Sequence, residues 1–344
     1  QGKAWVQHMA NNQLSAAVIG LGVGGRHITA YREAGADVLA ICDTDEDILG
    51  QVGDVYGIAD RYTDFRELGM RDDIDVVSVC PPAHLHPDPA VTMMASGKHV
   101  LIEMPMASTF EDIERIVDTA RRTNRKVMHG GQVAYSEAFD EIKRGVASGE
   151  FGEIYYAEGD YIASRLDLLR GGWRQHLRSN YNVVADRGVV PIDVVQWIVG
   201  DAPAEVMAYG NGIAGCGEGL KATDCILSMI RFEGGCIAKS LVTMGAARPG
   251  FRNLQIYGTK KTYVTEPSPP GHLLSDAESR RWTHLEFKED RRDARRSLIA
   301  DLLWAIKTDT EPRASLVQAA RTAGICAAAF ESLKAGRPVK VPQF

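Results

Sequence analysis

The chain has 344 residues, of which 45% are hydrophobic and 24% charged, as expected for a globular protein with a large core and about two domains. Its 39 Lys and Arg residues face 45 Asp and Glu residues, and this acidic balance argues against a nucleic acid or an anionic membrane surface as partner. No stretch approaches the roughly 18 apolar residues that a membrane span needs. The six cysteines form no C-x-x-C pair, which favours free thiols in a cytoplasmic protein over disulfides or a metal site.

Residues 1–12 show no periodic pattern. The Gln-Gly start ahead of Met9 is typical of an expression-tag remnant, so we expect these residues to be disordered and leave them out of the fold prediction.

Residues 13–135 alternate short apolar runs with amphipathic stretches. This alternation predicts repeated βαβ units, and so an α/β domain with a doubly wound parallel sheet, the Rossmann fold. The expected strands are 16–19, 38–42, 75–80, 99–102 and 126–128, and the expected helices are 26–34, 45–56, 87–96 and 109–123.

Residues 136–344 have a different texture, with longer strands and a Gly234-Gly235 hairpin signal. We expect an α+β domain with a large open, mainly antiparallel sheet for substrate binding and oligomerisation, and a C-terminal segment able to pack back on the first domain. Residues 266–271 are interpreted as an irregular loop, and the charged run 288–296 as a solvated loop entering a helix. The expected strands are 154–161, 205–209, 225–232, 236–242, 254–258 and 262–264, and the helices are 291–307 and 315–335.

The motif Gly20-Leu21-Gly22-Val23-Gly24-Gly25 follows the first strand and opens a helix. Glycines there let a backbone approach a pyrophosphate at the helix N-terminus, although a simple tight turn would use the same residues. Asp43 ends the second strand, where an acid binds ribose hydroxyls; the alternative is that it caps the next helix. The acid, followed by the uncharged Thr44, favours NAD over NADP.

Several motifs resemble the Gfo/Idh/MocA family (glucose-fructose oxidoreductase, inositol dehydrogenase and related proteins). They are the glycine motif, Pro81-Pro82-Ala83-His84-Leu85-His86, the segment 97–105 containing Glu103-Met104-Pro105, and the closing segment 329–342. The resemblance spans about residues 14–342. It implies a Rossmann domain and a substrate domain whose open sheet mediates dimers or tetramers. It also implies oxidation or reduction of sugar and cyclitol hydroxyl and keto groups with a bound nicotinamide.

Two departures from the family pattern bear on catalysis. Met104 stands where the family's Glu-Lys-Pro motif has its Lys, and Val190 stands where the catalytic His is expected. Asp186 and Asp193 of that second motif are kept. Because neither Met nor Val handles a proton, the chain resembles an atypical member without the usual acid-base groups.

The resemblance, with these departures, implies a set of site residues. Cofactor contacts are expected from the glycine motif with Asp43 and Thr44, and on the nicotinamide side from Pro81, Pro82, His84, His86 and Glu103. Substrate contacts are expected from Met104, Trp173, Arg174, Val190 and Asp193, and the substitute catalytic residues are Tyr135, Asp186 and His176. The structural alternatives are core packing for Trp173, a solvated loop for His176 and a helix cap for Asp186.

The favoured function is NAD-dependent oxidation or reduction of a sugar, cyclitol or related polyol, with a non-standard proton donor, in a homodimer or homotetramer. One alternative is an NAD-dependent glycosidase working by transient oxidation and elimination, since residues 157–162 and 171–174 resemble such enzymes. Their Thr-His-Gly element, however, would fall on residues 186–188, where the His is absent. Another alternative is a catalytically inactive sensor or partner protein that binds dinucleotide or sugar.

Overall fold

The computed structural model describes residues 13–169, 183–216, 223–267, 270–287 and 291–344. The chain divides into two compact units. The first comprises residues 1–107, 111–132 and 290–316, and the second comprises 108–110, 133–289 and 317–344. The sequence placed a boundary after residue 135 and allowed a C-terminal segment to pack back on the first domain. The late segment that joins the first unit is 290–316.

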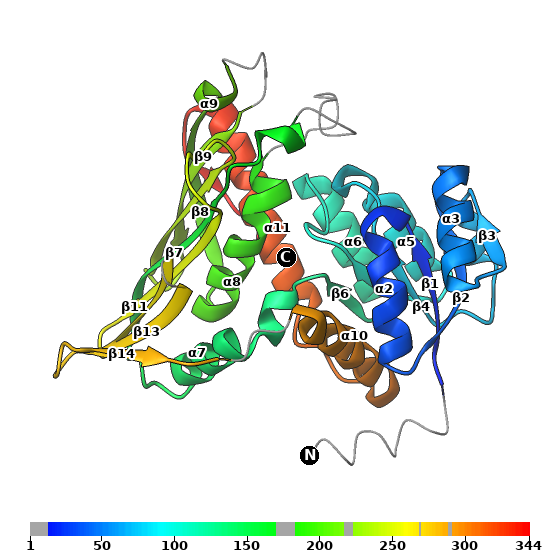
Figure 1. Ribbon diagram of the computed structural model, residues 1–344, viewed down its shortest axis with the longest axis horizontal. Coiled ribbons are helices and arrows are strands. Elements are labelled where there is room, and N and C mark those ends of the chain that lie inside the picture. The colour runs from blue at the N-terminus through cyan, green and yellow to red at the C-terminus, as the bar shows by residue number, and fades with distance from the viewer. Residues whose placement is uncertain (1–12, 170–182, 217–222, 268–269, 288–290) are drawn as a thin grey trace. The chain divides into compact units, whose positions relative to one another are not determined.

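The first unit is built on a six-stranded parallel sheet in the order β3-β2-β1-β4-β5-β6 (Figure 1). This order is that of a Rossmann fold, so the predicted α/β class is confirmed. Buried apolar side chains fill the central strands; all four residues of β4 are inaccessible to solvent. The strands are β1 Ser15–Ile19, β2 Asp37–Cys42, β3 Asp60–Tyr62, β4 Val76–Val79, β5 His99–Ile102 and β6 Val127–His129.

Helices flank this sheet and begin where the sequence supplies a start signal. The helix α3 is an example, because the Asp45 carboxylate accepts hydrogen bonds from the Asp47 and Ile48 amides and Gly57 ends the helix in the left-handed region. The late helix α10 packs against α2, burying Leu298, Ile299, Leu302 and Leu303. The helices are α2 Leu21–Glu33, α3 Glu46–Tyr56, α4 Arg66–Gly69, α5 Pro87–Ala95, α6 Phe110–Thr123 and α10 Arg291–Thr308.

The second unit contains a nine-stranded sheet in the order β14-β13-β12-β11-β7-β10-β9-β8-β15. Every neighbouring pair is antiparallel except β7 with β10, so the predicted open, mainly antiparallel sheet is confirmed. The strands are β7 Ile154–Ile162, β8 Pro203–Asn211, β9 Cys225–Phe232, β10 Ile237–Thr243, β11 Phe251–Gly258, β12 Lys261–Pro267, β13 Pro270–Asp276, β14 Trp282–Leu285 and β15 Val339–Lys340. The helices are α7 Glu137–Ala147, α8 Val189–Val199, α9 Ile213–Cys216 and α11 Leu316–Ala335.

One sequence prediction for this sheet is wrong and another is confirmed. Residues 266–267 and 270–271, expected in an irregular loop, belong to β12 and β13, which pair as far as Pro267 and Pro270. The prolines of this segment suggested a loop, but it lies toward the sheet edge, where prolines are tolerated. The hairpin expected at Gly234-Gly235 joins β9 to β10, and Gly235 takes the left-handed conformation that such turns require.

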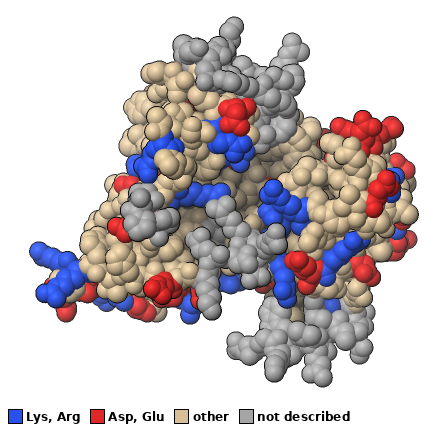
Figure 2. Space-filling model, viewed as in Figure 1, with Lys and Arg blue, Asp and Glu red and all other residues tan. Residues whose placement is uncertain are grey.

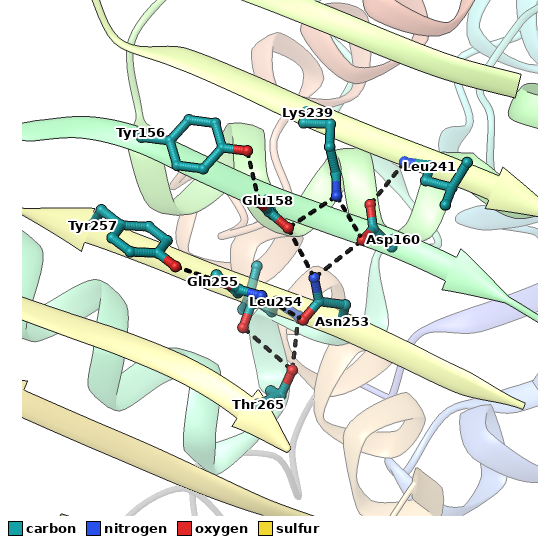
Figure 3. Close-up of polar contacts among 10 residues, drawn as sticks. All are labelled: Tyr156, Glu158, Asp160, Lys239, Leu241, Asn253, Leu254, Gln255, Tyr257 and Thr265. Carbon is teal, nitrogen blue, oxygen red and sulfur yellow. Dashed lines mark hydrogen bonds and ion pairs between the residues drawn. The ribbon is translucent and has the colours of Figure 1, made fainter. Parts of the chain in front are cut away.

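The two faces of this sheet differ. Gly159 of β7 faces α8, because a Cβ there would lie 2.7 Å from the Pro191 carbonyl oxygen and from the Val195 side chain. Its neighbours Glu158 and Asp160 point to the opposite face, where both accept hydrogen bonds from Lys239 and Asn253 (Figure 3). Burial raises the pKa of Glu158, but its hydrogen bonds outweigh this and hold the pKa below its ordinary value.

No helix in the described part of the chain is long and apolar enough to cross a membrane. On the face shown in Figure 2, basic and acidic side chains are interspersed.

Candidate functional site

The turn after β1 is shaped by glycines with two different roles. Gly20 has φ 83°, and a Cβ on it would lie 2.5 Å from the Pro81 nitrogen; a Cβ on Gly24 would lie 2.7 Å from Val18. These two glycines allow the turn, β4 and α2 to pack closely. By contrast, nothing lies within 4 Å of a Cβ on Gly22 or Gly25. The described residues thus leave room beside the helix N-terminus, as a diphosphate group would require.

The start of α2 carries neither an acidic residue in its first turn nor a side-chain cap at Gly20. Instead the Asp43 carboxylate reaches across from the end of β2. It accepts hydrogen bonds from the Leu21 amide at 2.7 Å and the Asp45 amide at 3.0 Å. Because Asp45, not Asp43, caps α3, the alternative considered for Asp43 is wrong. Asp43 lies beside the glycine turn, and the adjacent Thr44 is exposed.

The loops after β4 and β5 are tied together by His86. This buried side chain contacts the Pro105 carbonyl oxygen through Nδ1 at 2.9 Å and the Pro81 carbonyl oxygen through Nε2 at 2.8 Å. Burial lowers the pKa of His86, and the two carbonyl contacts oppose this shift only in part. Pro82 and His84 are half-buried in the same loop. In a parallel sheet these loops form the carboxyl-end edge, where ligands bind.

A buried chain of hydrogen bonds leads from this edge into the core. Glu103 Oε1 lies 2.8 Å from His27 Nε2, His27 Nδ1 lies 3.1 Å from the Ser78 hydroxyl, and Ser78 donates to the Tyr31 hydroxyl at 3.0 Å. Burial raises the pKa of Glu103, but hydrogen bonds from His27 and the Met104 amide outweigh it and keep the carboxyl ionised. The pairing of His27 with Glu103 was not predicted from the sequence. The sequence feature that could have pointed to His27 is its place on the second turn of a helix that opens with a glycine motif.

Another residue missed by sequence, Arg295, belongs to α10. With the Gln132 amide oriented so that its oxygen faces the guanidinium, Gln132 accepts from Arg295 Nε at 3.1 Å and Nη2 at 2.7 Å. Arg295 also interacts electrostatically with Glu103 and Cys80. The charged run 288–296 was expected to be a solvated loop entering a helix. The helix begins at Arg291 as expected, but Arg295 is half-buried.

Three predicted residues of the second unit, Asp186, Val190 and Asp193, lie on α8 or in the turn just before it. Asp186 lies in a π-helical turn, 11% exposed, with an ion pair of 3.1 Å to Arg187. Val190 is the second residue of α8, which follows this turn. Asp193 is buried, and its Oδ1 accepts from Thr322 at 2.8 Å and from Gln318 at 2.9 Å, which links α8 to α11. Its substrate role stays a prediction. Tyr135 is half-buried at the end of a 3₁₀ turn. Trp173, Arg174 and His176 lie outside the described residues.

Among the described residues, no group of three or more His, Cys, Asp or Glu side chains is arranged to hold a metal ion.

The doubly wound sheet, the glycine turn and the acid at the end of β2 define a protein of the dinucleotide-binding class. Residues 14–131 match the Gfo/Idh/MocA oxidoreductase family as its NAD-binding Rossmann fold, and residues 143–341 match that family's C-terminal α/β domain. The chain therefore belongs to the Gfo/Idh/MocA family, and its cofactor is NAD.

Individual similar proteins place the chain within this family. A protein of Shewanella baltica named "Glycosyl hydrolase family 109 protein" is 33% identical over 193 residues, which are 50% of this chain and 42% of that protein. The match thus covers less than half of the length of these curated relatives. Levoglucosan dehydrogenase in complex with NADH superposes with a TM-score of 0.86 at 21% identity, covering 97% of this chain and 100% of that one. An oxidoreductase from Agrobacterium radiobacter, in complex with NAD+, L-tartaric acid and magnesium, gives 0.83 at 20% identity, with 96% and 99% covered.

Proposed function

We propose that the protein is an NAD-dependent oxidoreductase acting on a hydroxyl or keto group of a sugar, cyclitol or related polyol. The observation that carries the proposal is the complete cofactor edge, with Asp43 at the end of β2 and the space beside Gly22 kept clear. Bound NAD supplies a hydride acceptor at its nicotinamide ring. Asp43 binds adenosine ribose hydroxyls and its charge disfavours a 2′-phosphate, so NAD is preferred over NADP.

The proton is handled by a group other than the family's Lys. Met104 has no proton to give or take, and Glu103 is held ionised by His27 and the Met104 amide. We assign the proton transfer to Tyr135, with Asp186 and Asp193 orienting substrate hydroxyls and His176 as a further candidate. Met104, Val190, Trp173 and Arg174 line the substrate. Replacing Tyr135 by Phe is then expected to lower kcat about 10²- to 10⁴-fold without weakening NAD binding.

The glycosidase is the second candidate, and the curated relatives favour it, since they are named as family 109 glycosyl hydrolases. In this reaction a sugar carbon is oxidised transiently, which acidifies the neighbouring C–H bond. Loss of that proton and of the leaving group is followed by water addition and return of the hydride. The cofactor edge serves both reactions equally, and they differ in whether NADH accumulates.

One incubation separates these functions. The protein is mixed with NAD or NADH and a panel of polyols, keto-sugars and nitrophenyl glycosides, and both NADH and nitrophenol are followed. A net change in NADH establishes the dehydrogenase. NAD-dependent nitrophenol release at constant NADH establishes the glycosidase. Nucleotide binding without either change, across the panel, points to a sensor and overturns both. Tyr155→Phe is the control for Tyr135→Phe, because Tyr155 is 53% exposed on β7.

We also propose that the protein self-associates through the sheet face opposite α8. Direct cross-strand partners share a face, so Met229 lies beside Lys239, which in turn neighbours Glu158. On this face Met229 and Ile237 are 48% and 52% exposed around the charged cluster of Figure 3. Apolar side chains framing a satisfied polar cluster suit a second copy of the same face.

A further inference from the structure

The guanidinium of Arg295 occupies a distinctive place in the first unit. It hydrogen bonds to Gln132, three residues after β6, and interacts electrostatically with Glu103, which follows β5, and with Cys80, which follows β4. The loops that follow β5 and β6 therefore lie near one positive charge. In doubly wound sheets this edge is where the dinucleotide lies.

Of the charges that act on Arg295, the Glu103 carboxylate acts most strongly, but among the described residues it forms no hydrogen bond to the guanidinium. Glu103 already accepts hydrogen bonds from His27 and from the Met104 amide. A second arginine, Arg26 of α2, is near enough for its charge to act on Arg295. Among the described residues, Arg295 hydrogen bonds to the neutral amide of Gln132 and to no carboxylate. A half-buried cation anchored by a neutral group, with a like charge nearby, is suited to an anionic ligand.

The anchoring also fixes how the guanidinium can be used. Gln132 engages Nε and Nη2 on one side of the planar group. Backbone hydrogen bonds fix the position of Gln132. Its backbone amide donates to the Gly130 carbonyl at 2.8 Å, and the Gly130 backbone amide donates to the Ile102 carbonyl at 2.8 Å. An arginine held in this way presents its Nη1 side without further loss of side-chain entropy.

We propose that Arg295 is a cofactor-binding residue whose guanidinium holds an anionic oxygen of the NAD diphosphate, on the phosphate nearer the nicotinamide. The glycine turn supplies backbone amides to that group, and α10, which packs against α2, brings a full positive charge from about 270 residues further along the chain. This inference rests on the NAD-binding domain and not on the proposed substrate.

Binding titrations with NAD, ADP-ribose and AMP test the proposal in the full chain, without any turnover. For Arg295→Gln we expect about 10- to 100-fold weaker binding of NAD and ADP-ribose, the loss of one charge-assisted hydrogen bond. AMP, which lacks the second phosphate, should stay within about twofold. The matched control is Arg296→Gln, which removes the same charge from the exposed neighbour on α10 and should leave all three ligands unchanged.

Each other outcome overturns the proposal. Unchanged ADP-ribose binding by Arg295→Gln would remove the diphosphate as ligand, even if NAD binding or substrate KM changed. Equal losses for AMP and ADP-ribose, or for Arg295→Gln and Arg296→Gln, would mean a structural or diffuse electrostatic effect. Arg295→Lys, which keeps the charge and loses the planar geometry, should give an intermediate affinity and a salt dependence close to that of the parent protein. If it matches the Gln variant in both measurements, the charge is not what binds.

Discussion

The two kinds of glycine in the turn after β1 predict opposite effects of the same substitution. In Gly24→Ala, the new Cβ would lie 2.7 Å from the buried Val18 side chain, so we expect unfolding free energy to fall by about 1–3 kcal/mol. In Gly22→Ala, the new Cβ meets nothing within 4 Å and the backbone is helical, so stability should rise by about 0.4–1 kcal/mol. The methyl group would instead occupy the room left for the diphosphate.

Thermal unfolding with and without NAD measures both effects. At an NAD concentration 100 times its Kd, binding stabilises the parent protein by about 2.7 kcal/mol. If Gly22→Ala loses one charge-assisted hydrogen bond, about 100-fold in affinity, the same concentration stabilises it by only about 0.4 kcal/mol. Gly24→Ala should start from a lower Tm and keep its response to NAD. A full NAD response in Gly22→Ala would refute the assignment of that space to the cofactor.

Further predictions follow from single contacts. Asp43→Asn should weaken NAD binding at least about tenfold and lower the preference for NAD over NADP. Fluorescence titrations with both nucleotides measure this, and an unchanged ratio of the two Kd values would contradict the role of the charge. The pKa of His99 is lowered to about 4, mainly by burial, and its Nδ1 accepts from the Lys126 amide. Between pH 6.5 and 4 His99 is therefore protonated in the unfolded chain but not in the folded protein. The free energy of unfolding should fall by about 1–2 kcal/mol over this range, a value already reduced for the partial exposure of His99. In His99→Asn, the free energy of unfolding measured in urea should depend less on pH over that range. Asp193→Ala should cost about 1–3 kcal/mol in urea unfolding and Asp193→Asn much less, whereas equal losses would mean that the contacts to α11 are weak. Met229→Glu should lower the mass measured by light scattering, and an unchanged oligomer would exclude this face of the sheet.

The parts of the fold that sequence predicted are those whose strands are buried. The apolar run at β4 and the alternation of β9 and β10 reflect real burial, and each was predicted as a strand. The edge strands β3 and β14 were missed because an exposed strand need not show an apolar pattern; Trp282 on β14 is 52% exposed. The return of residues 290–316 to the first unit had no local signal, because it depends on what α10 packs against.

The candidate site shows the same division between local and distant information. The glycine turn and Asp43 could be found because a motif and a spacing define them. His27 and Arg295 could not be assigned, because their partners are distant in the sequence. Glu103 lies 76 residues from His27, and Gln132 is further still from Arg295. An arginine in a run of mixed charges is usually solvated, and only the tertiary fold distinguishes Arg295 from Arg296.

The late position of α10 has a consequence for how the protein is made. Residues up to 132 contain every strand of the parallel sheet, yet four large side chains of α10, including Leu302 and Ile299, complete the core of that unit. During synthesis the cofactor-binding unit therefore stays unfinished, with apolar surface uncovered, until residue 316 has left the ribosome. By then every strand of the nine-stranded sheet except β15 has emerged, so a fragment ending at the first boundary would lack α10 and leave this apolar surface uncovered.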